Sequence, residues 1–294
     1  MSTLRSGGVS APPYASLNLG GHVGDAPEAV AQNRRVLAAA AGLPSEPAWL
    51  AQVHGVEVVD LDAVGQAGIS GSPRPADAAF TRRTGRVCAI LTADCLPILL
   101  TADSGDVVAA AHAGWRGLAG GVIEATVRAL GVAPARLMAW LGPAIGPQHF
   151  EVGSEVREAL LQGDLGAEDA FVPNARGRFM ADLAVLARRR LTALGVSRVY
   201  GGDHCTFGDS ERYFSHRRDG VTGRQATLIW LEPAARPRSV MEDATQRRRL
   251  RNEVKQRSVG GSYLEIRLLR PGLGRGLVIV SPGRLPGRPV KRTR

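Results

Sequence analysis

The amino-acid sequence predicts an α+β fold for residues 12–231. The chain has 294 residues, of which 44% are hydrophobic, so it is long enough and apolar enough to bury a full core. Apolar runs with the length of buried strands are interspersed with helix-like segments, without a strict β-α-β alternation. The expected strands are 56–61, 87–91, 98–101, 107–111, 137–141, 196–200 and 226–231, and the expected helices are 25–43, 118–130, 153–161 and 181–194.

Boundary signals support these elements. In the first expected helix, Asp25 can cap the amino end, Pro27 fits the first turn and Gly42 lies at the carboxyl end. Pro97 has no backbone N–H to donate, which disfavours it inside a paired strand. We therefore expect residues 93–97 to interrupt the ladder between the apolar strands on either side.

Composition excludes several classes of protein. No apolar run is long enough to cross a membrane, because Asp94 interrupts the longest one. The first residues contain no apolar stretch typical of a signal peptide. The three cysteines, at positions 88, 95 and 205, are too few and too scattered for a disulfide framework. We expect a cytoplasmic protein without a membrane partner.

The net charge of +10 comes from the end of the chain. From Arg236 onward there are 16 Lys+Arg and 4 Asp+Glu, a net charge of +12, which leaves −2 for residues 1–235. The body therefore gives no electrostatic reason to expect nucleic-acid binding. We divide the chain into a catalytic domain, 1–232, and a basic extension, 233–294, which we expect to be disordered apart from one short strand at 276–280 without a partner. A nucleic-acid-binding arm and the product of a shifted reading frame are the alternatives for this extension.

Three residues are candidate metal ligands: His54 in Gln-Val-His-Gly, Cys95 in Thr-Ala-Asp-Cys-Leu-Pro, and His112 in Ala-His-Ala-Gly-Trp-Arg-Gly. One thiolate and two imidazoles suit zinc or copper, and three protein ligands leave a fourth position open, as in catalytic sites. Taken singly, each has a plainer interpretation: His112 as a hydrogen-bonded core histidine, Cys95 as inert core and His54 as a turn residue. Because the three lie far apart in the sequence, the fold has to bring them together.

The segment around His112 also offers an anion site. A buried strand is expected to carry His112 at its carboxyl end, and Gly114 and Gly117 then allow a tight turn into a helix. A helix start attracts anions, and Arg116 adds a planar, two-pronged donor. Without further support, a surface salt bridge explains Arg116 better than an anion site does.

Other polar residues near these segments are candidates for substrate contacts or proton transfer. Asp94 can orient a ligand, hold a proton or cap its turn, while Gln52 and Asn18 lie where each can line a cavity. Arg217 and Arg218 can bind an anion or form a surface pair. His204 and Cys205 rank below the first three ligands, because adjacent strand residues rarely point toward one metal. The thiol of Cys88 lies within an apolar strand and is expected to be inert.

Seven segments, taken in order, resemble the YfiH / laccase-domain family, which is also called the polyphenol oxidase family and is now regarded as a family of purine nucleoside phosphorylases. The resemblance covers nearly all of residues 12–231, and seven ordered segments make it far more specific than one short motif. The segments are SLNLGGHVG (16–24), QVHG (52–55), ADAAFT (76–81), LTADCLP (91–97), AHAGWRG (111–117), GPAIGPQHFEVG (142–153) and YFSHRRDGVTGR (213–224).

The resemblance implies a single domain of layered α/β/β/α architecture with the site in a central cleft. It implies that His54, Cys95 and His112 are zinc ligands and that the activity is phosphorolysis of adenosine and inosine to the free base and ribose 1-phosphate. Methylthioadenosine cleavage and adenosine deamination are also attributed to the family. Ala144 and Gln148 stand where some relatives carry cysteines, which favours zinc over a copper cluster here.

The leading hypothesis is a zinc-dependent purine nucleoside phosphorylase, acting as a monomer or small homo-oligomer. Its partners are a purine nucleoside and inorganic phosphate. Arg116 and neighbouring N–H groups would hold phosphate, Asp94 would transfer a proton, and Asn18, Gln52 and Arg217 would bind substrate. The alternatives are a copper-dependent phenol oxidase, a metal-free hydrolase using Cys95 with His112 as base, and a binding module stapled by structural zinc.

Overall fold

The computed structural model describes residues 1–64, 73–162, 164–232, 266–268 and 277–279. Its α-helices are α1 (Pro27–Ala41), α3 (Trp115–Gly120), α4 (Val122–Leu130), α5 (Ser154–Leu161), α6 (Leu183–Ala193) and α7 (His216–Asp219), and two 3₁₀ segments span Pro134–Arg136 and Leu165–Ala170. Its strands are β1 (Val58–Asp60), β2 (Ala78–Thr81), β3 (Val87–Thr92), β4 (Leu96–Ala102), β5 (Val108–Ala113), β6 (Leu137–Leu141), β7 (Glu151–Val152), β8 (Phe171–Pro173), β9 (Phe179–Ala181), β10 (Arg198–Gly201), β11 (Gln225–Trp230), β12 (Ile266–Leu268) and β13 (Leu277–Ile279).

A six-stranded mixed sheet forms the centre of the fold, with strand order β1-β2-β5-β4-β6-β10. The outer pairs β1/β2 and β6/β10 are parallel, whereas β2/β5, β4/β5 and β4/β6 are antiparallel. The strands β3 and β11 form a separate antiparallel pair, and β7, β9 and β8 form a small antiparallel sheet. This mixture of parallel and antiparallel pairing confirms the α+β class.

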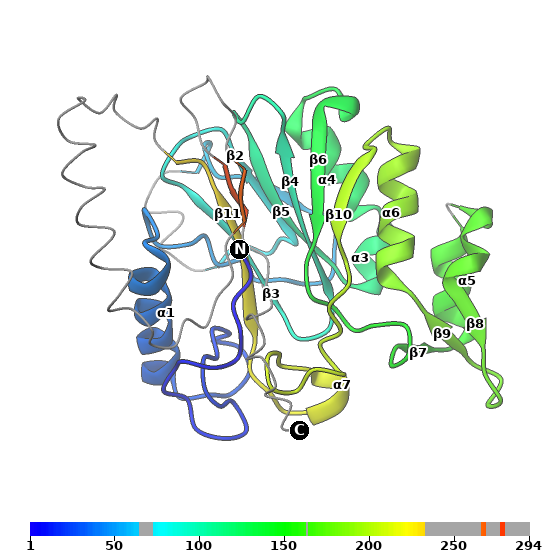
Figure 1. The fold of residues 1–294 in the computed structure, drawn as a ribbon, viewed down its shortest axis with the longest axis horizontal. Helices are drawn as coiled ribbons and strands as arrows, with labels where there is room; N and C mark the ends of the chain where they lie inside the picture. The colour runs from blue at the N-terminus through cyan, green and yellow to red at the C-terminus, as the bar shows by residue number, and fades with distance from the viewer. Residues whose placement is uncertain (65–72, 163, 233–265, 269–276, 280–294) are drawn as a thin grey trace, which may run out of the picture.

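Side chains that alternate along each strand pack against different layers of the fold. In β3, Val87, Ala89 and Leu91 pack in one apolar cluster with Leu37 of α1, whereas Cys88 and Ile90 face the six-stranded sheet. The opposite face of that sheet packs against α4 and α6. Figure 1 shows the resulting order, with α1 on one side, the two sheets between, and α4 and α6 on the other side. Because successive strand residues point to opposite faces, one period-2 pattern supplies two buried interfaces.

Two helix predictions require correction. The expected helix 118–130 is two helices, because Gly121 adopts a φ of 96° between α3 and α4. The expected cap by Asp25 does not form. Residue Ala26 occupies the cap position of α1, and the Asp25 carboxylate instead accepts hydrogen bonds from Ser10 and Asn18. At the other end of α1, Gly42 lies at the helix end as the sequence predicted, and it adopts the left-handed conformation.

The interruption predicted for residues 93–97 is shorter than expected. Strand β4 begins at Leu96 and includes Pro97, although β4 lies between two partners. Pairing with β6 starts only at Ile98, and the carbonyl of Pro97 accepts a hydrogen bond from Gly142. The missing N–H of Pro97 therefore falls where the ladder with β6 has already ended, so no pairing is lost.

Several strands carried no recognised signal in the sequence. We did not expect β2, which is short and alanine-rich, or the three short strands β7, β8 and β9. A strand was expected at 276–280, where β13 lies, but it has a partner, because β12 pairs with it antiparallel. The rest of the predicted extension lies outside the described residues. In the part of the chain that the structure describes, no helix is long and apolar enough to cross a membrane.

Candidate metal centre

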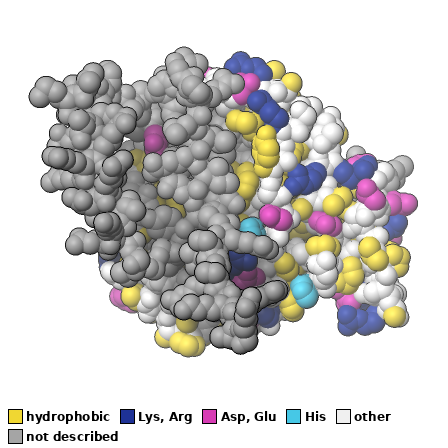
Figure 2. All heavy atoms as spheres, viewed as in Figure 1, with side chains coloured by type: hydrophobic (Ala, Val, Ile, Leu, Met, Phe, Trp, Pro, Cys, Tyr) yellow, Lys and Arg dark blue, Asp and Glu magenta, His cyan; other side chains and the backbone are white. Residues whose placement is uncertain are grey.

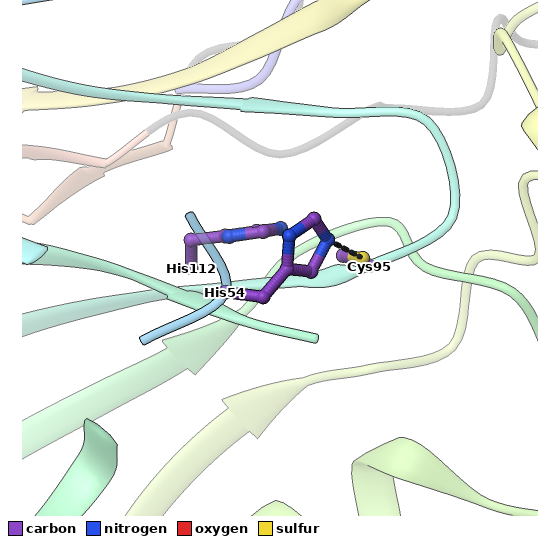
Figure 3. A group of neighbouring side chains, drawn as sticks. All are labelled: His54, Cys95 and His112. Carbon is purple, nitrogen blue, oxygen red and sulfur yellow. Dashed lines mark hydrogen bonds between the residues drawn. The ribbon is translucent and has the colours of Figure 1, made fainter. Parts of the chain in front are cut away.

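The fold brings His54, Cys95 and His112 together from three separate elements (Figure 3). His54 lies in the turn before β1, Cys95 lies between β3 and β4, and His112 is in β5. Their ligand atoms all lie within 4.8 Å of one another, with 3.8 Å between Nε2 of His54 and Sγ of Cys95. The centroids of the two imidazole rings are 4.8 Å apart, and the ring planes are inclined by 67°. The juxtaposition that the sequence motifs predicted is present.

The buried carboxylate of Asp77 holds two of these residues in place. It lies just before β2 and is fully buried. Its Oδ1 accepts hydrogen bonds from the backbone N–H of His54, at 2.9 Å, and from Nδ1 of His112, at 2.8 Å. Its Oδ2 accepts from the backbone N–H groups of Val53, at 3.2 Å, and Gly55, at 2.6 Å. One carboxylate therefore shapes the His54 turn and leaves Nε2 of His112 free to bind a metal.

The electrostatics favour the thiolate of Cys95. Burial by itself would raise the pKa of this thiol, but the charge of His112 and hydrogen bonds from both histidines lower it to about 6. Burial likewise opposes the charged form of His112, but Cys95 and Asp77 together raise its pKa. Because the thiolate is the form that binds metal and acts as a nucleophile, the site prepares Cys95 for either role. Burial raises the pKa of the Cys88 thiol, and that residue is inert core as expected.

Close packing around the ligands depends on a glycine. A Cβ at Gly114 would lie 2.9 Å from Sγ of Cys95 and 3.0 Å from Cδ2 of His54. The first distance is shorter than real Cβ contacts and the second is tighter than nearly all of them, although the φ of Gly114, −64°, suits any residue. Gly114 is therefore required by space rather than by backbone conformation, and it is the residue from which α3 starts.

The two non-glycine residues with positive φ in the described part of the chain both lie at this site. They are His54, with φ 61°, and Asp94, with φ 111°. Such conformations are uncommon outside glycine and collect at functional sites, where surrounding contacts maintain them. For His54 those contacts come from Asp77, and for Asp94 they come from two distant segments.

Asp94 precedes Cys95, but its carboxylate is engaged elsewhere. Its Oδ1 accepts a hydrogen bond from the Thr206 hydroxyl at 2.6 Å, and its Oδ2 accepts one from the backbone N–H of Arg217 at 2.7 Å. Its carbonyl accepts a third bond from Ile145. These contacts tie the Cys95 turn to the segments before β7 and around α7.

The amides expected to contact substrate are both hydrogen-bonded to the protein. Gln52 donates to the carbonyl of Leu91 and accepts from its N–H, each at 2.8 Å. Asn18 is fully buried; its oxygen accepts from Gly20 and Arg224, and its nitrogen donates to Gly20 and Asp25. Each of the two amides therefore fixes backbone segments that are distant in the sequence.

The arginines singled out in the sequence differ in how much of their hydrogen-bonding capacity is used. Arg116 is exposed at the start of α3 and lies over the Trp115 ring, 4.3 Å from its centroid. Arg217 donates to the carbonyls of His149 and Glu151. Arg218 donates to backbone carbonyls of 206, 207 and 213 and pairs with Asp219. Of these three arginines, Arg116 is the one whose guanidinium has no hydrogen-bond partner within the described residues.

His204 and Cys205 lie apart from the ligand group, as their lower rank anticipated. They line a pocket shared with Ala144 and Gln148. The Cys205 sulfur accepts backbone N–H groups of Gly146 and Gly208. Within the described residues, the one cluster of histidine, cysteine or carboxylate groups close enough to share an ion is His54, Cys95 and His112.

The donor set fits a zinc ion. Ligands at zinc–nitrogen and zinc–sulfur distances in a tetrahedral site lie roughly 3.5 Å apart. The 3.8 Å between Nε2 of His54 and Sγ of Cys95 is close to that separation. The carboxylate behind His112 is the type of partner that orients metal-bound histidines. Fold and site together define a layered α+β protein with a Cys/His₂ group that can hold a metal ion.

Comparison with known proteins agrees with this class. The family model described as multi-copper polyphenol oxidoreductase laccase matches residues 1–232. The chain belongs to this family, the YfiH / laccase-domain family. The match ends at the boundary predicted between the domain and the basic extension.

Relatives cover the same region. The chain is 51% identical over 233 residues to the Escherichia coli protein named purine nucleoside phosphorylase YfiH, covering 78% of this chain and 92% of the relative. It is 54% identical over 231 residues to a Pseudomonas aeruginosa protein also named purine nucleoside phosphorylase, with the same coverage. A crystal structure of a Neisseria meningitidis protein superposes with a TM-score of 0.75 at 49% identity, covering 79% of this chain and 93% of that one. The structure of YlmD from Geobacillus stearothermophilus gives a TM-score of 0.72 at 35% identity, covering 78% and 90%.

Proposed function

We propose that this protein is a zinc-dependent purine nucleoside phosphorylase that cleaves inosine and adenosine with phosphate to the free base and ribose 1-phosphate. The observation that carries the proposal is the open Cys/His₂ centre with its orienting carboxylate, in a chain about half identical to proteins named purine nucleoside phosphorylase. Methylthioadenosine cleavage and adenosine deamination are side activities that the same centre can support. A reducing cytoplasm suits a free Cys95 thiolate.

Zinc would be held by Nε2 of His54, Sγ of Cys95 and Nε2 of His112. When bound, it supplies a Lewis acid that polarises a substrate oxygen or activates a bound water. The residues of the chain do the remaining work. Asp77 keeps His112 in the tautomer that presents Nε2, and Gly114 gives the ligands room to converge.

Substrate handling is divided between direct and indirect contacts. The amides of Asn18 and Gln52 act indirectly, by fixing the backbone around the site, because their hydrogen bonds are already made. The backbone N–H of Arg217 acts in the same way, through its bond to Asp94, while Nη1 of its side chain donates to the carbonyls of His149 and Glu151. Arg116 has a free guanidinium at the edge of the site and is a candidate for contact with an anionic group.

Proton transfer to the leaving base is assigned to Asp94 as a prediction. Its two carboxylate oxygens already accept hydrogen bonds from Thr206 and Arg217, and this favours a positioning role. An isosteric amide at this position separates the two roles, because an amide keeps the shape and removes the acid–base function.

The test is metal content on purified protein, combined with an assay of hypoxanthine release from inosine at increasing phosphate. We expect about one zinc per chain and a rate that rises with phosphate and saturates. Cys95→Ser should lose both metal and turnover, whereas Cys205→Ser, outside the ligand group, should keep both. Base release that does not respond to phosphate would reject the phosphorylase.

The name of the family favours one rival, a copper-dependent phenol oxidase. That activity requires bound copper and oxygen consumption with a phenolic substrate, and a copper-free preparation with full activity excludes it. A metal-free hydrolase using Cys95 and His112 would survive chelation and fail on thiol alkylation. A purely structural zinc would make His112→Ala unfold the protein instead of leaving a folded, inactive one.

A further inference from the structure

A phosphorolytic enzyme needs a site for phosphate beside its reacting centre, and Arg224 has the required position. It is the residue before β11, whose register pairs Gln225 with Thr92, so Arg224 comes opposite the Ala93–Cys95 turn. Its backbone N–H donates to Oδ1 of Asn18, and its carbonyl accepts from Leu19. The backbone of Arg224 is thus hydrogen-bonded to the glycine-rich loop that contains Asn18 and Leu19, and it lies opposite the turn that carries Cys95.

The side chain of Arg224 is held by close contact. A Cβ at Gly20 would lie only 2.8 Å from Cγ of Arg224. Gly20 therefore lets the arginine stem lie against the loop backbone. The stem is only partly exposed, and the guanidinium is positioned before any ligand arrives.

The free donors of Arg224 lie on one edge. Its Nη1 donates to the carbonyls of Thr222 and Gly223, each at 3.0 Å. Within the described residues, Nε and Nη2 have no hydrogen-bond partner. These two nitrogens form the parallel fork that binds two oxygens of a phosphate or carboxylate at once. Nη1 thus fixes the plane of the group, and the opposite edge remains for an anion.

Neighbouring arginines lack such an edge. Arg34 donates through Nε and Nη2 to the carbonyl of Leu19 and stacks on Trp49. Arg218 has carbonyl or carboxylate partners for Nε, Nη1 and Nη2. Arg116 is free but exposed, and nothing in the described residues fixes its guanidinium by hydrogen bonding. Among these side chains, Arg224 alone combines a fixed position with an unused fork.

The electrostatics agree with this placement. Burial lowers the pKa of Arg224, while the charges of Cys95 and Asp94 raise it, so the guanidinium lies in the field of the ligand turn. Burial lowers the pKa of His22 as well, and the charges of Arg224, Arg34 and His112 lower it further. Both shifts show that the charge of Arg224 acts on the same region as His112 and the Cys95 turn.

We propose that Arg224 binds the phosphate co-substrate through its Nε–Nη2 edge, next to the centre formed by His54, Cys95 and His112. This inference rests on the proposed phosphorylase activity. It places the main phosphate contact at Arg224 rather than at Arg116, which is not held in place, or at Arg217, which is exposed and uses Nη1 to donate to the carbonyls of His149 and Glu151.

The test compares Arg224→Gln and Arg224→Lys with the wild-type holoenzyme. The KM for phosphate at saturating inosine should rise about 10- to 100-fold in Arg224→Gln, the effect of losing a charged hydrogen-bond pair. The KM for inosine should stay within about twofold, and zinc content should not change. Arg224→Lys keeps the charge without the fork and should recover part of the loss. Arg35→Gln is the matched control, an exposed arginine on α1 that donates only to Gln32 among the described residues.

Folding of the variants is checked by thermal unfolding, and it is expected to be retained because the bonds to Asn18 and Leu19 use backbone atoms. An unchanged phosphate KM in Arg224→Gln overturns the assignment, as does an equal rise in both KM values or a loss of zinc. A raised phosphate KM in Arg116→Gln alone would transfer the role to Arg116.

Titration calorimetry of the zinc-loaded protein with inorganic phosphate separates this inference from the proposed function. If inosine is not phosphorolysed but phosphate binds wild type and binds Arg224→Gln at least tenfold more weakly, the phosphorylase is rejected and the anion site at Arg224 stands. If wild type and Arg224→Gln bind phosphate equally, or neither binds it, the anion site is rejected whatever the activity.

Discussion

Two buried aspartates, Asp77 and Asp94, flank the candidate metal centre and have different structural roles. Asp77 is 23 residues from His54 and 35 from His112, yet its carboxylate bonds to both. Asp94 is adjacent to Cys95, yet its carboxylate bonds to Thr206 and Arg217, more than 100 residues away. Proximity in the sequence therefore fails to identify the carboxylate that orients the ligands.

The difference follows from where each residue stands in the sheet. Asp77 immediately precedes β2, which lies between β1 and β5, so its side chain reaches both the turn before β1 and the imidazole on β5. Asp94 is in the turn that leaves β3 for β4, at the edge where α7 and the segment before β7 arrive. One carboxylate sets the ligands, and the other fixes the turn that carries the thiolate.

The largest effect is expected from Asp77→Asn, which changes the carboxylate that orients the candidate ligands. Each of the two carboxylate oxygens accepts from two N–H groups. The amide of asparagine has a single acceptor oxygen, so two of the four N–H groups lose their acceptor. We expect zinc affinity to fall about 10- to 100-fold and the free energy of unfolding to fall by about 2–4 kcal/mol.

Zinc affinity by competition with a chromophoric chelator, together with denaturant unfolding, measures both effects. Asp62→Asn is the control, because that carboxylate also accepts from a hydroxyl and a backbone N–H but lies away from the ligands. Equal zinc affinity in Asp77→Asn and wild type would show that Asp77 serves the fold alone.

Gly114→Ala tests the space around the ligands without touching either carboxylate. The added methyl would press on Cys95 and His54, so zinc affinity should fall about tenfold, while the free energy of unfolding changes by less than about 1 kcal/mol. Gly208→Ala is a matched control, since its methyl would lie 3.6 Å from another cysteine and another histidine, an ordinary contact. Similar zinc affinity in both variants would contradict the packing argument.

A smaller effect is expected from Asp94→Asn. The amide oxygen can accept from the Arg217 N–H and the amide nitrogen can donate to the Thr206 hydroxyl, so both contacts survive. Asparagine also tolerates the positive φ of this position. If Asp94 acts by positioning, kcat should stay within about threefold and zinc content should be normal, whereas a fall of 10²-fold or more, within the range of general acid–base catalysis, would support proton transfer. A steady-state assay with inosine decides between the two.

The smallest effect is expected from deleting residues 236–294. The family match ends at residue 232, and the three ligands and both aspartates lie before it. We expect kcat and zinc content within experimental error of the full chain. A large loss of either would mean that the basic extension contributes to the site, and restoring residues 236–294 in stages would then locate the contribution.

On the face of the molecule in Figure 2, acidic and basic side chains of the described residues are interspersed around hydrophobic ones. This matches the nearly neutral balance of residues 1–235 and contrasts with the surplus of arginine beyond them. The body and the extension therefore differ in charge as clearly as in their relation to the family.

By itself, the sequence determined the long buried strands, most of the helix ends and the three candidate ligands. These follow from short-range physics: period-2 apolar patterns define two buried faces, Gly42 ends a helix through its own backbone, and thiol and imidazole groups are metal donors wherever they occur. The tertiary structure alone decided how the buried polar groups are paired. Gln52 and Asn18 are polar residues near the site in any interpretation of the sequence, but their partners are backbone groups brought close only by folding.

The same reason explains the roles of Asp77 and Arg224, which the sequence did not reveal although both lie in the recognised segments 76–81 and 213–224. Whether a carboxylate orients a ligand or an arginine edge stays free depends on every donor and acceptor that the fold places around it. The set of donors and acceptors around a side chain depends on long-range contacts, and no local sequence pattern encodes it.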